Sequence, residues 1–420
     1  MSLPIRRLAS FGALQLVATI APIAVLPLVV RMIGASGWVG MSIGYGVGAA
    51  AASVVALGWP VSGPPLVAAA ATDVRAVLFR ESLATRAAAA VVATAAAAGI
   101  SAALSPRGHG FLAAAMAAAI TSWGLTPSWY YVGIGQPRGI LVFETLPRLA
   151  ATMASIPVVA LTREAVSYPG LLLLASLGSF VISARRILGS TKGPWLENGW
   201  RARLRGNVSL SLGNLIGAGY TNLAVPIATA AQPGVHALAD LAASSRIRSM
   251  SQMGTASVAT AFQGWVAEEP AQARSRRRAA FALTTAVGLI TAALLFVIGP
   301  FISGILFGSN VRYGWLMSAV TAAGVIPYAL GATLSFHCLA PAGMHRQIAS
   351  SRIAATIVGV PMLYVGVRHS GAVGGAAASA ASEFVVVALQ ALAWRRLSAF
   401  NQPDPACSSA TRSDGVPTGP

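Results

Sequence analysis

Long apolar stretches, separated by short polar or basic segments, are the feature that most constrains the fold of this chain. A helix needs about 20 mainly apolar residues to cross a bilayer. Charged residues make up only 10% of the sequence, too few to cover a water-exposed surface. The sequence therefore predicts an all-α polytopic membrane protein with about twelve transmembrane helices. Their windows are roughly 9–30, 40–60, 87–105, 111–134, 147–162, 168–188, 208–230, 238–262, 279–302, 313–338, 348–367 and 371–394.

Lys and Arg residues are distributed unevenly between the two sides of these windows. If the N-terminus lies in the cytoplasm, 22 of the 29 Lys and Arg fall on the cytoplasmic side and five on the other, with Arg246 and Arg248 inside a window. This asymmetry follows the positive-inside rule. We expect a multi-pass protein of the cytoplasmic membrane with both termini in the cytoplasm. The net charge of +18 then records orientation and attraction to anionic membrane lipids, and no nucleic-acid partner is needed to explain it.

The chain carries an internal repeat at an offset of 204 residues. Residues 148–157 read RLAATMASIP, and residues 352–361 read RIAATIVGVP. Each half holds six windows, an even number, so both halves share one orientation. Parallel repeats of this kind place a substrate path between the halves, near the bilayer centre. At the same offset Pro137 matches Pro341, Gly139 matches Gly343, Gly170 matches Gly374 and Phe180 matches Phe384.

The repeat and the composition together divide the chain into four parts. Residues 1–188 form an N-terminal six-helix lobe, and residues 207–396 form a C-terminal six-helix lobe. Between them, residues 189–206 are polar and basic, which predicts a cytoplasmic linker. After Arg396 the apolar runs stop, so residues 397–420 are predicted to be a disordered cytoplasmic tail.

Several short motifs together form one family pattern: LPLVVRMIGASGW at 26–38, LGWPVSGPP at 57–65, QPGVHALADL at 232–241, LFG at 306–308, Gly343 and GAVGGA at 371–376. In their order and spacing they resemble the O-antigen-type flippases, in the polysaccharide flippase branch of the multidrug/oligosaccharidyl-lipid/polysaccharide exporter superfamily. The resemblance implies a lumen between two six-helix lobes that opens alternately to each side. It also implies a substrate made of an oligosaccharide on a polyprenyl diphosphate lipid.

Charged side chains at membrane depth are rare and usually face a cavity or a partner. Here they are Asp240, Arg246, Arg248 and Glu383. Arg246 and Arg248 are about 200° apart around a helix, so both cannot face one lumen. Arg248 shares a face with Asp240, which favours Arg248 as the cation for the diphosphate, against internal ion pairing or snorkelling. Glu383 is either a proton, cation or sugar site, or a structural partner of an Arg.

Uncharged polar residues add further candidates for the cavity. Gln15, Asn214, Tyr220 and Asn222 have side chains that bind sugar hydroxyls or join helices through interhelical hydrogen bonds. Glu144 and Arg148 stand four positions apart, the spacing of a helical ion pair, and we expect them at the cytoplasmic rim.

The leading hypothesis is a flippase for a lipid-linked oligosaccharide that works by alternating access as a monomer, without catalysis, cofactor or metal. A membrane enzyme of glycan assembly, such as a polymerase, ligase or glycosyltransferase, is the first alternative. It is disfavoured because the outer connections are short and the five His are scattered. A multidrug antiporter of the same superfamily would favour acidic groups in the lumen of the first half. A scaffold that only binds glycan-assembly proteins stays open.

Overall fold

The computed structural model describes residues 5–189, 195–196, 199–267, 273–311 and 313–400. This part of the chain is helical, and each of the twelve predicted windows falls on a helical segment. The helices of the first half are α1 (Ile5–Ala56), α2 (Trp59–Ala69), α3 (Thr72–Leu104), α4 (Gly110–Thr121), η1 (Ser122–Leu125), α5 (Ser128–Gly133), α6 (Pro137–Ile140), η2 (Leu141–Thr145), α7 (Leu146–Thr162) and α8 (Ser167–Leu188). Those of the second half are α9 (Trp200–Ala228), η3 (Thr229–Ala231), α10 (Val235–Ala267), α11 (Ala273–Phe307), η5 (Gly308–Asn310), α12 (Trp315–Thr333), η6 (Leu334–Leu339) and α13 (His345–Phe400).

The two longest helices, α1 and α13, each contain a turn that divides them into two membrane-crossing segments. In α1 the turn is at Gly34, with φ 65° and ψ −170°. In α13 it is at Ser370 and Gly371, where Gly371 has φ 55° and ψ −136°. These positive φ values favour glycine, which has no Cβ to clash. Among the described residues eight stretches are long and apolar enough to span a membrane, and those that include the two turns are 45 and 51 residues long. About 20 residues suffice for one crossing, so the second stretch, Arg346–Arg396, crosses once on each side of Gly371. In α1 the crossing before Gly34 begins at Ile5, upstream of the first stretch.

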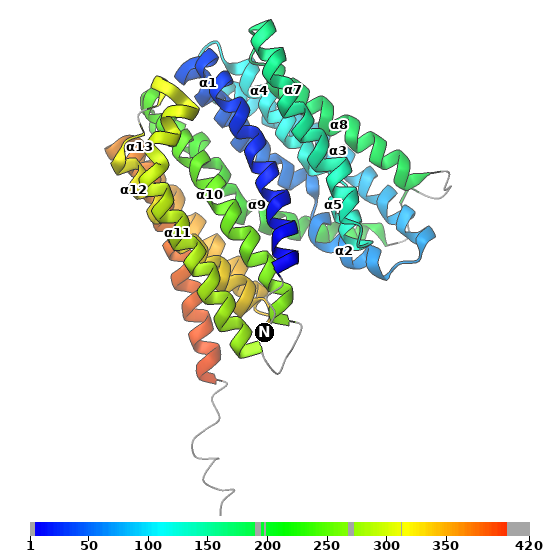
Figure 1. Ribbon diagram of the computed structural model, residues 1–420. Coiled ribbons are helices and arrows are strands. Elements are labelled where there is room, and N and C mark those ends of the chain that lie inside the picture. Colours follow the sequence, from blue (N-terminus) through cyan, green and yellow to red (C-terminus); the bar gives the residue numbers. More distant parts are fainter. Residues whose placement is uncertain (1–4, 190–194, 197–198, 268–272, 312, 401–420) are drawn as a thin grey trace, which may run out of the picture.

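The start of α1 and the end of α13 lie at the same end of the bundle (Figure 1). We call this the near end, which also carries α2, the end of α8 and the start of α9. The opposite end, here the far end, carries the turns at Gly34 and Gly371 and the connections 105–109, 163–166 and 232–234. An even number of crossings in each half produces this arrangement, as the repeat predicts.

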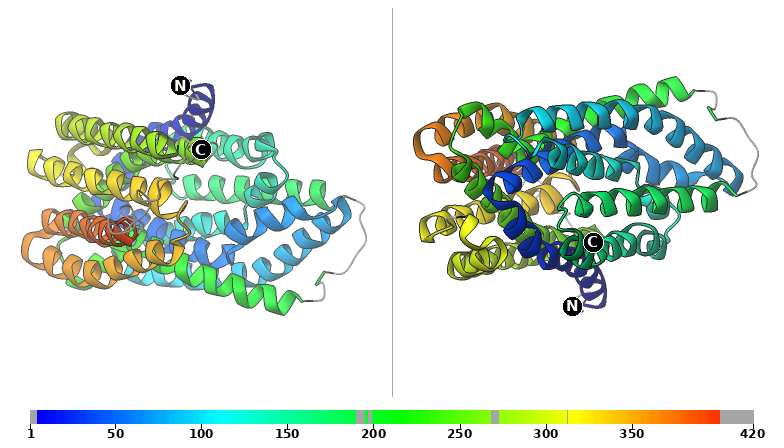
Figure 2. Two further views of the ribbon diagram at one scale, coloured as in Figure 1. Left: turned by 90° about the horizontal axis from the view of Figure 1, so that it is seen from below. Right: turned by 90° about the horizontal axis from the view of Figure 1, so that it is seen from above.

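The helices form two lobes, which confirms the predicted fold class. Helices α3 to α8 lie on one side and α10 to α13 on the other, in the view along the bundle as well as from the side (Figures 1 and 2). Helix α9 crosses between them. Near its start the Arg203 Nε donates to Glu81 Oε1 of α3 at 2.9 Å, which joins α9 to the first lobe. Further along, α9 packs so closely on α1 that a Cβ on Gly46 would lie 2.3 Å from the carbonyl oxygen of Asn222.

A buried arginine stabilises an irregular turn inside the first lobe. Pro127 has no N–H to continue a helix, and the chain between α4 and α5 changes to the short helix η1. This leaves carbonyl groups without helical partners. The fully buried Arg86 of α3 donates from Nη1 to the carbonyl oxygens of Gly124 and Thr126, at 3.1 Å each. The arginine therefore supplies the hydrogen bonds that the backbone lacks here.

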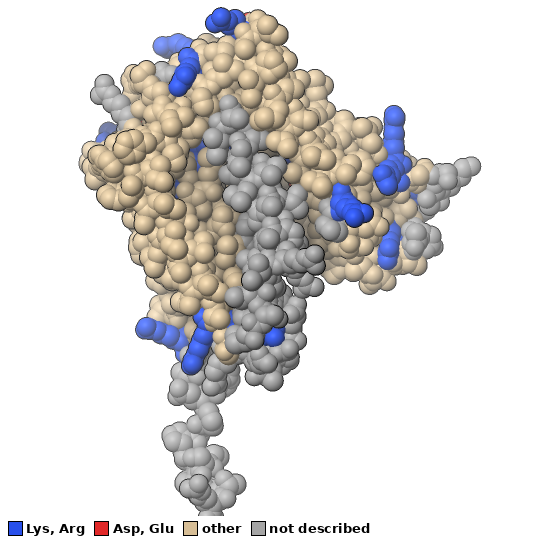
Figure 3. Space-filling model, in the orientation of Figure 1, with Lys and Arg blue, Asp and Glu red and all other residues tan. Residues whose placement is uncertain are grey.

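The outer surface of the bundle is apolar between its two ends. Phe111, Val91 and Leu161 are more than 70% exposed, which fits contact with lipid rather than water. On the face drawn in Figure 3, Lys and Arg side chains gather mostly toward the ends of the lobes. The charge distribution thus matches a bundle that spans a bilayer.

The helix bounds differ from the predicted domain limits at two places. Helix α9 begins at Trp200, inside the predicted linker 189–206, and α13 continues to Phe400, beyond Arg396. Hydropathy detects only the apolar part of a helix, and both helices extend past it with arginine-containing turns. Residues 401–420 of the predicted tail lie outside the described residues, and the domain limits themselves stay a prediction.

Candidate functional site: the interlobe cavity

A cavity lies between the two lobes and consists of two adjoining chambers. The far chamber has a volume of about 60 Å³ and the near chamber about 350 Å³. They share Tyr45, Met116, Tyr168, Arg246 and Ser249. The far chamber adds Leu26, Trp38, Met41, Ser42, Asn222, Val225, Ala242 and Ser245. The near chamber adds Ile120, Trp123, Ile140, Glu144, Thr145, Arg148, Leu149, Thr152, Leu172, Met250 and Met253.

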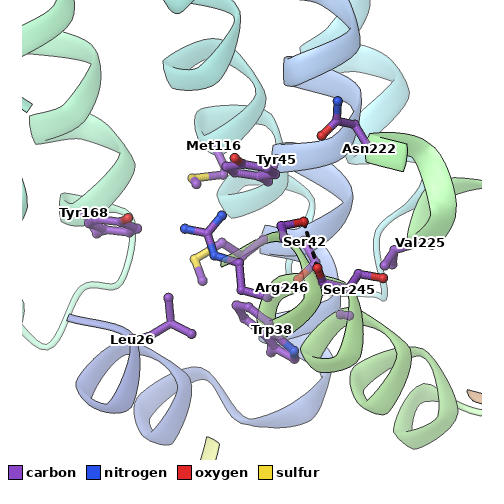
Figure 4. A pocket seen from close by; sticks show the side chains of 13 residues that line it. Leu26, Trp38, Ser42, Tyr45, Met116, Tyr168, Asn222, Val225, Ser245 and Arg246 are labelled. Atoms are coloured by element: carbon purple, nitrogen blue, oxygen red, sulfur yellow. Dashed lines mark hydrogen bonds between the residues drawn. The ribbon is translucent and has the colours of Figure 1, made fainter. Parts of the chain in front are cut away.

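Arg246 of α10 stands at the junction of the chambers. Its guanidinium carbon lies 4.8 Å from the ring centroid of Tyr45 on α1, within the range of a cation–π interaction. Tyr168 of α8 is buried, and its hydroxyl lies close enough to Arg246 for an electrostatic interaction. Figure 4 shows the guanidinium extending between Tyr45 and Tyr168. A cation from the second lobe is thus surrounded by tyrosines from the first.

A second arginine lines the near chamber. Arg148 Nη1 donates to Glu144 Oε1 at 3.1 Å, and its guanidinium carbon lies 4.4 Å from the ring centroid of Trp123. The predicted helical pair therefore forms, but its predicted place at the rim is wrong, because both side chains line the cavity. The position of the two residues in the helix was predictable from the sequence, but the direction in which their side chains point was not. An arginine stem is long enough to carry its charge well inside from a helix end.

The structure reverses the order that sequence analysis gave to Arg246 and Arg248. Arg246 lines both chambers, whereas Arg248 is 5% exposed and its Cδ packs near Gly324 of α12. Arg248 and Arg352 lie close enough to act electrostatically on Glu383 of α13. Arg248 and Glu383 thus belong to a charge cluster inside the second lobe, which corresponds to the internal-pairing alternative. The preference failed because it used Asp240 as a marker of the lumen face.

The structure describes the side chains of some of the remaining candidates and not of others. Asn222 of α9 lines the far chamber, and its role in binding substrate stays a prediction. Asp240 is half-buried in α10 and is not among the residues that line the described chambers. Gln15, Asn214 and Tyr220 lie outside the residues whose side chains the structure describes. Their predicted roles stay predictions.

At the far end the lobes close on each other around Trp38. The indole Nε1 of Trp38 in α1 donates to the carbonyl oxygen of Ala239 in α10 at 3.2 Å. Its ring lies 5.1 Å from that of Phe307, at the end of α11. Arg31 adds a bond of 3.5 Å from Nη2 to the Ile305 carbonyl oxygen. Contacts between the two halves therefore join the lobes on the far side of the cavity.

The aromatic lining was missed in the sequence. Tyr45, Trp38, Trp123 and Tyr168 contribute rings to the chambers. A usable signal existed for Tyr45, which lies well inside the window 40–60, whereas membrane tyrosines concentrate at the bilayer interfaces. The other three lie near window ends or in an irregular turn, where an interfacial position explains them equally well. Among the described residues no group of three or more His, Cys, Asp or Glu is placed to hold a metal ion.

Two helical lobes with a cavity between them are an arrangement found in alternating-access membrane transporters. Solved structures share it. The flippase described as "Lipid II flippase MurJ, inward closed conformation" matches with a TM-score of 0.74 and 12% identity over 92% of this chain and 87% of the flippase. An inward-facing multidrug resistance MATE transporter matches with a TM-score of 0.59 and 13% identity over 95% of this chain and 96% of that one.

A third similar structure is a transporter of the same superfamily from Pyrococcus furiosus, reported to have a binding pocket of reversed polarity. It matches with a TM-score of 0.57 and 14% identity, over 95% of this chain and 96% of that transporter. No protein-family model and no curated protein matches the sequence. The chain therefore has the fold of these three structures, one described as a flippase and two as transporters.

Proposed function

We propose that this protein flips an oligosaccharide linked to a polyprenyl diphosphate across the cytoplasmic membrane, by alternating access around the interlobe cavity. The observation that carries the proposal is the position of Arg246, a cation at the junction of the two chambers. A diphosphate needs a partner away from bulk water, because an isolated charge at low dielectric costs several kcal/mol. The planar guanidinium fork fits phosphate oxygens bidentately.

The charge balance of the cavity supports an anionic substrate. Its described lining contains two arginines, Arg246 and Arg148, and one carboxylate, Glu144. Glu144 is already bonded to Arg148, which leaves the charge of Arg246 without a carboxylate among the lining residues. A cationic drug would enter a cavity with an excess of the same sign. The charge balance thus weighs against a multidrug antiporter, although MATE transporters share the fold.

The uncharged lining suits a glycan. Tyr45 and Tyr168 carry hydroxyl groups, and Asn222 carries an amide that both donates and accepts hydrogen bonds. The near chamber, at about 350 Å³, lies within the usual range of ligand sites, so it accommodates a few sugar units rather than a long polymer. The lipid tail would stay in the bilayer while the headgroup crosses.

The predicted orientation belongs to this proposal. With both termini in the cytoplasm, the far-end contacts of Trp38 seal the outer side, and substrate enters from the cytoplasmic leaflet. A functional monomer stays a prediction. Membrane lipids are the surrounding partners, and contact with glycan-assembly proteins stays a prediction.

A flipping assay in liposomes tests the proposal. The purified full-length protein is reconstituted with a polyprenyl-diphosphate oligosaccharide that carries a fluorophore on its glycan, and an impermeant quencher is added outside. In protein-free vesicles only the outer-leaflet fluorophores are quenched, and active protein makes the inner-leaflet population accessible as well. Fluorescent phosphatidylcholine and an accumulated cationic dye are the comparison substrates. Transport of the dye with no movement of the lipid-linked glycan would favour the antiporter and refute the flippase.

A further inference from the structure

A second cavity, here the rim cavity, lies at the near end of the first lobe and is separate from the interlobe cavity. Its volume is about 510 Å³, and none of its described lining residues lines the two chambers described above. It lies where the turn after α5, the start of the helix α6–η2–α7 and the last turn of α8 come together. Its lining residues are Tyr131, Gly135, Gln136, Arg138, Gly139, Val142, Phe143 and Arg186.

The floor of the rim cavity is tightly packed. The ring of Tyr131 stacks on that of Phe143, with centroids 5.7 Å apart and an interplanar angle of 9°. The Tyr131 hydroxyl is 3.0 Å from the Ser183 hydroxyl of α8. Gly139 lies against the same ring, where an added Cβ would be only 2.2 Å from Tyr131 Cδ1. The backbone N–H of Gln136 donates to the Tyr131 carbonyl oxygen at 2.9 Å. These contacts hold the cavity in one shape.

The wall of the rim cavity is basic. Arg138 and Arg186 both line it with exposed side chains, and its described lining contains no carboxylate. The guanidinium carbon of Arg186 lies 5.7 Å from the ring centroid of Phe143, which orients it over the aromatic floor. The cavity therefore presents two cationic groups, one of them oriented by an aromatic ring, that no acid in its wall neutralises.

The position of the rim cavity matches the headgroup layer of the bilayer. Helix α8 has 22 residues and is thus about 33 Å long, close to the thickness of the hydrocarbon core, so Arg186 near its end lies at headgroup level. Arg138 lies at the start of α6, which lines the same cavity. Val142 also lines the cavity and is 48% exposed on the apolar outer surface. The cavity is thus open to lipid beside its charged part.

We infer that the rim cavity binds the phosphate headgroup of an anionic phospholipid. A phosphodiester offers the oxygens that two arginine forks bind, and its acyl chains would lie along the exposed apolar wall at Val142. Free inorganic phosphate shares the headgroup chemistry but lacks the chains. This site is independent of the transported substrate, because it needs neither Arg246 nor the interlobe cavity.

Native mass spectrometry of the full-length protein tests the inference, with phosphatidylglycerol and phosphatidylcholine added separately to the detergent-solubilised protein. We expect the first phosphatidylglycerol molecule to bind more tightly than those that follow, and we call this first binding event the tight step. Phosphatidylcholine should show no tight step. Each basic group near a membrane surface contributes about fivefold in affinity, so the double variant Arg138→Ala/Arg186→Ala should weaken this step about 30-fold. The single variant Arg138→Glu changes only an exposed side chain and should weaken it as well, even if the double variant folds poorly.

A charge-matched control separates a defined site from general attraction. Arg185→Ala/Arg201→Ala also removes two exposed arginines near this end of the chain and should leave the tight step unchanged. An equal loss of binding in this control, or full retention by Arg138→Glu, would overturn the inference. The last experiment adds millimolar inorganic phosphate to the complex with phosphatidylglycerol. If it displaces phosphatidylglycerol as fully as excess phosphatidylglycerol does, the lipid assignment is wrong and the site takes soluble phosphate.

Discussion

The first half of the chain lines the interlobe cavity from many directions, whereas the second half lines it mainly with one helix. Side chains of α1, α4, α7 and α8 and of the segment between α6 and α7 form most of the wall. Among the described lining residues, the second half contributes those of α10 and two of α9. The chemistry differs as well. The first half supplies the aromatic rings and the ion pair Glu144–Arg148, and the second half supplies Arg246, which has no further carboxylate among the described lining residues.

This inequality shows that a repeated scaffold need not give a symmetric site. The sequence match between 148–157 and 352–361 concerns how helices cross the bilayer and pack. At these matching positions Arg148 lines the cavity, while Arg352 acts on Glu383 inside the second lobe. The same residue type therefore lines the cavity in one half and acts on an interior carboxylate in the other. The following predictions test that division.

The largest effect is expected from the two neighbouring arginines of α10. Arg246→Ala should weaken binding of the lipid-linked diphosphate at least ~30-fold, because it removes the charge-assisted bonds to phosphate. Arg248→Ala should instead lower thermal stability by about 3 kcal/mol, since Glu383 loses a nearby cation in the lobe interior. Affinity is measured by ligand titration of the purified protein, and stability by thermal melting. The reverse pattern, with affinity lost in Arg248→Ala and kept in Arg246→Ala, would restore the sequence-based preference.

A smaller and opposite pair of effects is expected from the ion pair of the first half. Glu144→Gln removes a negative charge from the near chamber and should tighten diphosphate binding about fivefold. Arg148→Ala should weaken it about tenfold. The same titration measures both, and Glu164→Gln, an exposed carboxylate of a far-end connection, serves as the matched control. Weaker binding in Glu144→Gln would mean that the carboxylate itself contacts substrate.

The smallest effect concerns the ring that faces Arg246. Tyr45→Leu removes the cation–π contact, worth about 1 kcal/mol, and should weaken substrate binding about fivefold through a less ordered guanidinium. Tyr45→Phe keeps the ring and should change affinity less than about twofold. If the two variants lose affinity equally, the hydroxyl rather than the ring is the important group, and Tyr45 acts directly on the glycan.

The fold was predictable from sequence because lipid imposes one simple requirement, a long apolar helix for each crossing. All twelve windows fall on helical segments, and the breaks predicted at 31–39 and 368–370 lie at or next to the turns at Gly34 and Gly371. The site was less predictable. Helical arithmetic showed that only one of Arg246 and Arg248 faces the lumen, but the choice depends on where α1 and α12 lie, which no local pattern records. The predicted position of Glu144 and Arg148 was wrong for the same reason, because the sequence does not record the direction in which a side chain points.

The central claim is that a lipid-linked diphosphate enters the interlobe cavity and is held there by Arg246. Site-specific photocrosslinking tests it most directly, with p-benzoylphenylalanine in place of Met253, which lines the near chamber, or of Leu289, which is 49% exposed on the outer surface. The account predicts crosslinks to the lipid-linked glycan at position 253 that disappear with Arg246→Ala, and only bulk phospholipid at position 289. Equal glycan crosslinking at both positions, or crosslinks at 253 that survive Arg246→Ala, would contradict it.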